Sequence, residues 1–152
     1  MIKLILKLLM RGIKVGLKLD ESVLADFKCL PENYIIKINV LPNNITVCAQ
    51  CKNNSIIVLK EEPQTADLLV EFKDEKSAIN CLLGKCSLAT AFCEHRIKIY
   101  GNINNAMALT RIVNTIETYL FPKFITSKLF TPIPNLTSSK FKFYINLLFG
   151  GK

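Results

Sequence analysis

Alternation of apolar and polar residues predicts four half-buried β-strands. In residues 67–73, charged side chains fall on one side and Leu68, Val70 and Phe72 on the other, which is the period-two pattern of a strand with one face in a core. The same alternation occurs in residues 34–40, 45–51 and 96–100, and asparagine-containing turns separate the upstream strands. Residues 55–60 contain a continuous apolar run instead, which predicts a central strand buried on both faces.

Helical spacing of apolar residues appears between and after the last two strands. Asp74 and Gly84 bracket a short helix, because aspartate caps a first turn and glycine ends a last one. Ser87 caps a second helix over residues 88–92, and a broad apolar stripe predicts a long helix over residues 103–120. The first three strands form a meander. With helices on one face of the five strands, the pattern predicts an α+β layer architecture.

The last two strands and their helices carry a family resemblance. It rests on the run ADLLVEFKDE at residues 66–75, on LLGK at 82–85, and on AFCEHRIKIYGNINNAMAL at 91–109. These segments resemble the C-terminal half of a sterol carrier protein type-2 domain. With the upstream strands, the resemblance covers residues 22–120 and leaves residues 1–21 and 121–152 as terminal arms. It implies a five-stranded, mostly antiparallel sheet covered by helices on one face, with an apolar cavity between the layers.

The resemblance implies a function as well. It indicates non-catalytic binding of one lipid (sterol, fatty acyl or isoprenoid) and its carriage or presentation near a membrane surface, without a cofactor. Met107 and Phe92 are the preferred wall residues, since a thioether and an aromatic ring suit varied ligands. Every candidate lining residue also fits an ordinary core. The candidates are Ile36, Ile38, Val47, Val70, Phe72, Leu82, Phe92, Ile97, Ile99, Met107, Ile112 and Ile116.

Catalysis and metal binding find little support in the chain. Its glycines are scattered, so no phosphate-binding loop is present. Cys48 and Cys51 have the spacing of half a zinc site, but side chains three apart in a strand point to opposite faces. Cys93 and His95 are two residues apart at a predicted helix-to-strand junction, where they would not face each other as nucleophile and base. We therefore expect no metal site and no enzyme.

The excess positive charge lies in the two arms. The formal net charge is +8, yet residues 20–119 carry more acids than bases. Spacings of three and four residues align five cations on one helical stripe of the N-terminal arm. These candidate membrane contacts are Lys3, Lys7, Arg11, Lys14 and Lys18.

Two interpretations of this N-terminal helix remain open. It can lie on an anionic membrane with its apolar side immersed. Alternatively, it packs on the domain with the basic stripe in solvent, bent around the sheet at Gly12 and Gly16. The helix is neither a transmembrane span nor a typical signal peptide, because Lys7 and Arg11 interrupt its apolar run.

The C-terminal arm is interrupted by prolines. One short helix is expected over residues 123–130, followed by residues 140–149, a mostly apolar run with two lysines that is too short to span a bilayer. This run can cover the cavity mouth, bind a membrane or pair with another protomer. Residues 150–152 do not form a peroxisomal Ser-Lys-Leu address, which favours a bacterial-type stand-alone relative.

Two alternative functions follow. Within the same resemblance, the chain can be an accessory protein that presents isoprenoid quinone intermediates to biosynthetic enzymes. From another class, it can be a basic nucleic-acid-binding module that uses residues 140–144 as a basic aromatic strip, although the mostly aliphatic arms make nucleic acid an unfavoured partner. The expected partners are a lipid ligand, an anionic membrane surface, and a lipid-metabolising enzyme or a second copy of the chain.

The cysteines indicate where the protein works. Six cysteines without a secretory signal indicate a reducing compartment in which the thiols stay free. We therefore expect a cytoplasmic protein, with a peripheral location at the inner face of the membrane as the extension of that expectation.

Overall fold

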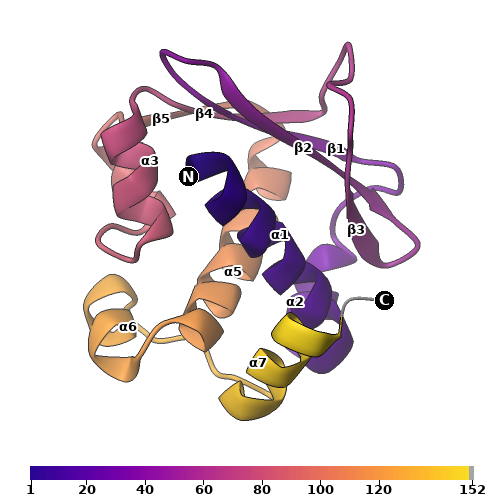
Figure 1. The fold of residues 1–152 in the computed structure, drawn as a ribbon, viewed down its shortest axis with the longest axis vertical. Coiled ribbons are helices and arrows are strands. Elements are labelled where there is room, and N and C mark those ends of the chain that lie inside the picture. The colour runs from indigo at the N-terminus through magenta and orange to yellow at the C-terminus, as the bar shows by residue number, and fades with distance from the viewer. Residues whose placement is uncertain (151–152) are drawn as a thin grey trace.

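One sheet, covered by helices on a single face, forms the fold (Figure 1). The computed structural model describes residues 1–150. Gly151 and Lys152, which belong to the C-terminal tripeptide considered above, lie outside the described residues. The strands are β1 (Ile35–Val40), β2 (Ile45–Lys52), β3 (Ser55–Val58), β4 (Leu68–Phe72) and β5 (Ile97–Gly101).

The strands follow the order β3-β2-β1-β4-β5. All neighbouring pairs are antiparallel except β1 and β4, which run parallel. The predicted meander and the mostly antiparallel sheet are therefore confirmed. The inward residues of the alternating strands are also as expected, since Ile36, Val70 and Phe72 are buried.

The prediction of a central position for residues 55–60 is wrong. Strand β3 lies at the edge and pairs only with β2. Ile56 is buried, but Ile57 is 48% exposed on the opposite face. An apolar run does not show how many neighbouring strands pair with it, so the edge position of β3 could not be predicted from the run.

The helices form a layer under the sheet. In residues 1–150 they are α1 (Ile2–Leu19), α2 (Glu21–Phe27), α3 (Glu75–Leu82), α4 (Leu88–Cys93), α5 (Ile103–Leu120), α6 (Lys123–Leu129) and α7 (Lys140–Phe149). The predicted caps are present. The Asp74 carboxylate accepts from the Ser77 backbone N–H at 2.7 Å, and the Ser87 hydroxyl accepts from the Thr90 N–H at 3.1 Å. Helix α2 was not expected. Asp20 caps its first turn, because the Asp20 carboxylate accepts hydrogen bonds from two backbone N–H groups.

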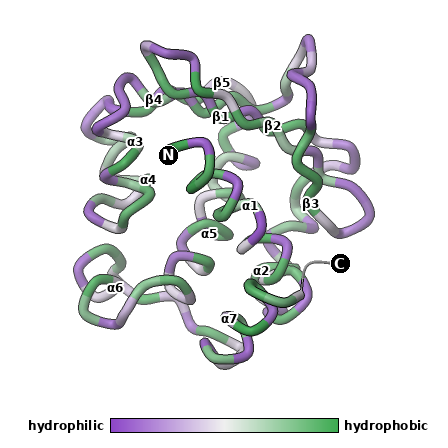
Figure 2. Tube along the Cα trace, in the orientation of Figure 1, coloured by the Kyte–Doolittle hydropathy of each residue, from purple (hydrophilic) through white to green (hydrophobic). Residues whose placement is uncertain are grey.

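Helix α1 belongs to the core of the protein. It packs against β2 and β3 and against α2, α5 and α7, and Figure 2 shows hydrophobic stretches along it. A Cβ added at Gly12 or Gly16 would lie 2.9 or 2.4 Å from the Ile116 side chain of α5. The two glycines therefore let α1 and α5 approach closely. The buried apolar residues of α1 are Ile2, Leu6, Leu9, Met10, Ile13, Val15 and Leu17.

This packing matches the second interpretation of the N-terminal helix. All five cations of the basic stripe are exposed, while most of the apolar side is covered by protein. That side is consequently not available for immersion in a membrane. Within residues 1–150, no helix is long and apolar enough to cross a bilayer.

A buried polar cluster joins the N-terminal and C-terminal segments. Asp20 accepts hydrogen bonds from the Tyr119 hydroxyl at 2.5 Å and from the Thr137 N–H at 3.1 Å. Burial alone would raise the pKa of Asp20, but the bonds from Ser22, Tyr119 and other donors lower it below its ordinary value. Burial and the same hydrogen bond raise the pKa of Tyr119 to about 12, so the phenol keeps its proton. The chain after α6 is thus anchored to the start of α2.

Candidate functional site

An apolar pocket of about 390 Å³ lies between the β4–β5 side of the sheet and helices α4 and α5. Its wall contains ten apolar side chains and only two polar ones, Thr110 and Arg111. The lining residues are Val70, Leu88, Ala89, Phe92, Ile97, Ile99, Ile103, Ala106, Met107, Leu109, Thr110 and Arg111.

Strand pairing and helix caps place these side chains. Val70 of β4 lies directly opposite Ile99 of β5, so the two side chains share a face of the sheet. The Asn102 side chain caps α5 by accepting from the backbone N–H groups of residues 104 and 105. It thereby fixes the face of α5 on which residues 103, 106, 107 and 110 follow one another at helical spacing.

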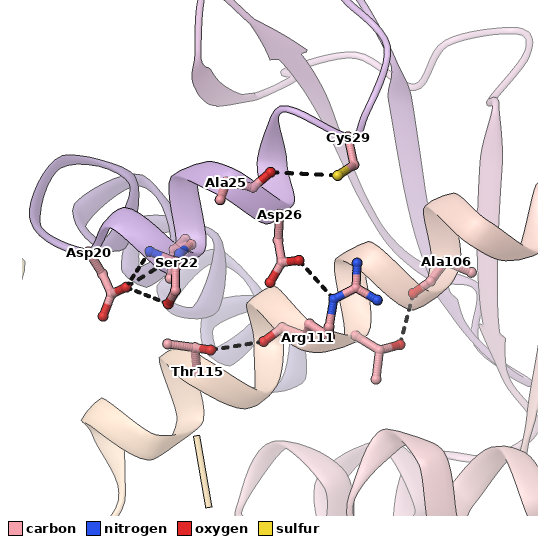
Figure 3. A network of polar contacts seen from close by, with 10 residues as sticks. Asp20, Ser22, Ala25, Asp26, Cys29, Ala106, Arg111 and Thr115 are labelled. Atoms are coloured by element: carbon pink, nitrogen blue, oxygen red, sulfur yellow. Dashed lines mark hydrogen bonds and ion pairs between the residues drawn. The ribbon is translucent and has the colours of Figure 1, made fainter. Parts of the chain in front are cut away.

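The polar groups of the wall have partners. The Thr110 hydroxyl donates to the Ala106 carbonyl of its own helix at 2.9 Å. Arg111 Nε donates to Asp26 Oδ1 of α2 at 2.7 Å, as Figure 3 shows. The Arg111 side chain is 51% exposed. The pocket therefore has an apolar interior and a cation at its rim.

Five of the predicted lining residues lie in this wall. They are Val70, Phe92, Ile97, Ile99 and Met107. Both preferred wall residues are thus in position, and their contact with a ligand stays a prediction.

The other seven predicted residues lie elsewhere, which corrects their assignment to the cavity wall. All seven belong to the packed core or lie against it: Ile36, Ile38, Val47, Phe72, Leu82, Ile112 and Ile116. Val47 borders a separate polar hollow next to Lys3 and Lys7. The physical reason is α1, which occupies the space beneath β2 and β3 and contacts Ile116 through Gly12 and Gly16. Among the described residues, the apolar pocket lies on the β4–β5 side of the space between the layers.

Several residues of the wall are not among the predicted lining residues. Leu88 and Ala89 follow the predicted Ser87 cap, and Ile103 and Ala106 precede the middle of the long helix. For Ile103 and Ala106 the sequence holds a signal: residues 103, 106, 107 and 110 have helical spacing and therefore share one side of the first two turns of α5.

The basic stripe of α1 divides into two parts. Lys3 and Lys7 border the polar hollow together with Glu61 and Glu62, whose charges oppose theirs. Arg11, Lys14 and Lys18 border another hollow with Gly150, close to the end of α7. The predicted membrane contacts therefore do not form one uniform surface.

The cysteines give little scope for catalysis. Burial raises the pKa of Cys51 and of Cys81 to about 12, which keeps both as thiols. Cys93 and His95 are exposed at the end of α4. Among residues 1–150, no three His, Cys, Asp or Glu side chains gather as metal ligands.

Two buried polar atoms on α5 stand out. Glu117 Oε2 and Asn114 Oδ1 have no hydrogen-bond partner within the described chain. Burial raises the pKa of Glu117 to about 8, so this carboxyl group holds its proton at neutral pH. Neither residue lines the apolar pocket.

The basic aromatic strip of residues 140–144 is split by the fold. Phe143 is buried and stacks on Tyr119 with ring centroids 4.5 Å apart. The Lys140 ammonium donates to the Phe121 carbonyl at 2.6 Å. Neither side chain is therefore free to meet a nucleobase or a phosphate, which weakens the nucleic-acid alternative.

The strand order and the single helical layer are those of the sterol carrier protein type-2 fold. The solved structure titled "UbiJ-SCP2 Ubiquinone synthesis protein" superimposes with a TM-score of 0.53 and 12% sequence identity, covering 72% of this chain and 96% of that one. The resemblance noted in the sequence is thereby confirmed at the level of the fold.

Weaker structural matches come from animal and yeast proteins. Sterol carrier protein 2 like 2 from Aedes aegypti has a TM-score of 0.48 and 11% identity over 73% of this chain and 98% of that one. Sterol carrier protein 2 from Yarrowia lipolytica has a TM-score of 0.47 and 20% identity over 69% and 86%. By sequence, no protein-family model and no curated protein matches the chain.

Proposed function

We propose that this protein binds one apolar lipid chain in the pocket between β4, β5, α4 and α5, and carries or presents it near a membrane without catalysing a reaction. The observation that carries the proposal is the pocket itself, about 390 Å³ in volume with ten apolar side chains in its wall. Ligand pockets commonly measure about 300–1,000 Å³ and have mainly apolar walls with few polar groups.

Burial of hydrocarbon is the driving force for binding. Each methylene group removed from water contributes about 0.8 kcal/mol. A segment of about ten methylenes therefore gains about 8 kcal/mol before the entropy cost of association. Because the polar wall groups already have protein partners, an entering hydrocarbon chain leaves none of them without a hydrogen bond.

The rim favours a ligand with an anionic end. The Arg111 guanidinium is partly exposed and uses Nε for its bond to Asp26. A fatty-acid carboxylate at the mouth can accept from the remaining guanidinium N–H groups. Arg111→Gln should therefore lower the affinity for a fatty acid more than the affinity for the matching fatty alcohol, as measured by competition binding. Equal weakening of both ligands would remove the carboxylate contact from the proposal.

A pocket-filling substitution tests the proposal. Met107 lies in the wall and is 54% exposed, so the indole of Met107→Trp has room to turn into the pocket without disrupting the core. We expect at least tenfold weaker binding of a fluorescent fatty-acid analogue. Ile57→Trp is the matched control, because Ile57 is 48% exposed on edge strand β3, outside the pocket.

Circular dichroism distinguishes a filled pocket from an unfolded protein. A folded Met107→Trp variant that binds the analogue as tightly as the wild type would contradict the proposed pocket. A folded variant with weakened binding, beside an unaffected Ile57→Trp, would support it.

A second candidate function is presentation of isoprenoid quinone intermediates to a biosynthetic enzyme. It is favoured by the fold match with the protein titled as a ubiquinone synthesis protein. Native mass spectrometry of the purified full-length chain, followed by solvent extraction, separates the candidates. A bound species of prenyl mass favours the quinone role, whereas fatty-acyl or sterol masses favour general lipid carriage.

A further inference from the structure

The outer side of helix α7 exposes an unusual amount of apolar surface. Phe141, Leu148 and Phe149 are 76%, 68% and 83% exposed, and much of the helix is coloured hydrophobic in Figure 2. A contiguous apolar patch of this kind on a folded domain marks an interaction surface. We name it the α7 outer face; its residues, spaced as one side of a helix, are Phe141, Tyr144, Ile145, Leu148 and Phe149.

The exposure is not the result of a loose tail. The opposite side of α7 inserts Phe143 and Leu147 into the core. The Lys140 ammonium donates to the Phe121 carbonyl at 2.6 Å, and the Tyr144 hydroxyl donates to the Leu120 carbonyl at 2.8 Å. These contacts fix α7 on the end of α5, so the α7 outer face is held toward solvent.

Cations flank this face. The Arg11 guanidinium donates to the Leu148 carbonyl at 3.3 Å, and Arg11, Lys14 and Lys18 border a hollow together with Gly150. Lys142 is exposed on α7 itself. Residues 120–152 contain no aspartate or glutamate. The apolar face therefore lies beside positive charge from two helices.

We propose that the α7 outer face inserts into the interfacial region of an anionic membrane, with Arg11, Lys14 and Lys142 at the level of the lipid phosphates. An apolar helix face with cations beside it is the arrangement that binds such interfaces. A second copy of the chain is disfavoured as the occupant, because two copies joined through this face would bring like charges together.

Helices α1 and α7 contribute differently to this membrane contact. Most of the apolar side of α1 is covered by protein, so α1 mainly supplies charge and α7 supplies the inserting side chains. Lys3 and Lys7 are left out of the contact, since they border the hollow that contains Glu61 and Glu62.

The position of α7 also bears on the orientation of the lipid pocket. Helix α7 packs against α1 and α5, whereas the pocket lies between α5, α4 and the β4–β5 side of the sheet. Figures 1 and 2 place α7 and β5 at opposite ends of the molecule. A protein docked through α7 therefore keeps its pocket away from the bilayer, which favours presentation of a ligand to a partner. This consequence rests on the proposed function, whereas the docking surface itself does not.

Vesicle sedimentation of the full-length protein tests the docking surface. Wild-type protein should bind vesicles of equal phosphatidylglycerol and phosphatidylcholine at least tenfold more tightly than vesicles of phosphatidylcholine alone. The double variant Phe141→Ser/Leu148→Ser should lose at least tenfold in affinity for the anionic vesicles. Phe124→Ser is the matched control, because Phe124 is 67% exposed on α6, outside the α7 outer face, and it should bind as the wild type does.

Three results would overturn the inference. One is failure of the wild type to bind anionic vesicles, and another is an equal loss in Phe124→Ser. The third is a dimer in analytical ultracentrifugation that the double variant abolishes, which would assign the face to self-association. Uptake of a fluorescent fatty acid should be unchanged in the double variant, so failure of the lipid pocket and failure of the docking surface give different results.

Discussion

The buried carboxyl group of Glu117 predicts a specific dependence of stability on pH. Glu117 is buried on α5, and its Oε2 atom has no hydrogen-bond partner within residues 1–150. Burial raises the pKa of this group from 4.5 to about 8. In the unfolded chain the carboxyl group is in water and titrates at its ordinary value. The folded protein therefore holds a proton that the unfolded chain releases between these two pH values.

The sign and size of the effect follow from this difference in bound protons. Between about pH 4.5 and 8 the unfolded state binds fewer protons, so the free energy of unfolding falls as pH rises. Each unit of pKa shift corresponds to about 1.4 kcal/mol, which sets an upper bound of about 5 kcal/mol for the whole range. Below this range both states are protonated and the contribution vanishes. Above it the penalty is complete and constant.

Glu117→Gln isolates the contribution. The amide has the same shape and does not titrate, so any cost of its own hydrogen bonding is independent of pH. Urea unfolding of both proteins at several pH values between about 5 and 9 gives the difference in unfolding free energy. We expect the variant to gain stability relative to the wild type by up to about 1.4 kcal/mol per pH unit, with a plateau above about pH 8.

A surface substitution controls for the loss of one negative charge. Glu61 is exposed, so Glu61→Gln measures the effect of removing a carboxylate that is not buried. A stability difference between Glu117→Gln and the wild type that is the same at every pH would refute the burial of a protonated carboxyl group at this position.

Other substitutions test the packing that positions the site. Gly16→Ala should destabilise the fold by about 1–3 kcal/mol in chemical denaturation, because the new Cβ would lie 2.4 Å from Ile116 Cδ1. The loss should shrink in an Ile116→Val background, which lacks that atom; an undiminished loss would point to another cause. Asp20→Asn turns an amide donor toward the donors of Tyr119 and Thr137, so it should lower the unfolding free energy by about 1–3 kcal/mol and speed proteolytic release of α7. Because hydrogen bonds lower the pKa of Asp20, the stability that this carboxylate contributes is present above about pH 3.8. It should be lost as the pH falls through the pKa of Asp20 in the folded protein. An Asp20→Asn variant that unfolds in acid at the same pH as the wild type would contradict this. Tyr144→Phe removes the bond to the Leu120 carbonyl and should cost about 1 kcal/mol in thermal unfolding, whereas no change in melting temperature would show that this bond does not hold α7.

Local elements could be predicted well from the chain. The alternation in β1, β2, β4 and β5, and the caps at Asp74 and Ser87, depend on residues close in sequence. Their physical signals, side-chain period and backbone hydrogen-bond capping, are written within a few residues. The general fold followed, because five strands with helices that cover one face allow few layer arrangements.

The site was predicted only in part, for a physical reason that lies in α1. Val70, Phe92, Ile97, Ile99 and Met107 line the pocket as expected. Other candidates have the same apolar character and are packed solid. No local pattern distinguishes a side chain that meets a hollow from one that meets another side chain, since the difference depends on which distant segment fills the space.

The sequence by itself determined the alternating strands, the helices that start at Asp74, Ser87 and Ile103, and the basic stripe on α1, because each depends on a pattern along a continuous segment. The tertiary structure alone decided that α1 enters the core at Gly12 and Gly16, that an apolar pocket lies beside β4 and β5, and that α7 turns an apolar side outward. These outcomes depend on contacts between segments far apart in the chain. Their free energies come from shape and burial, which become defined only when the layers are packed together.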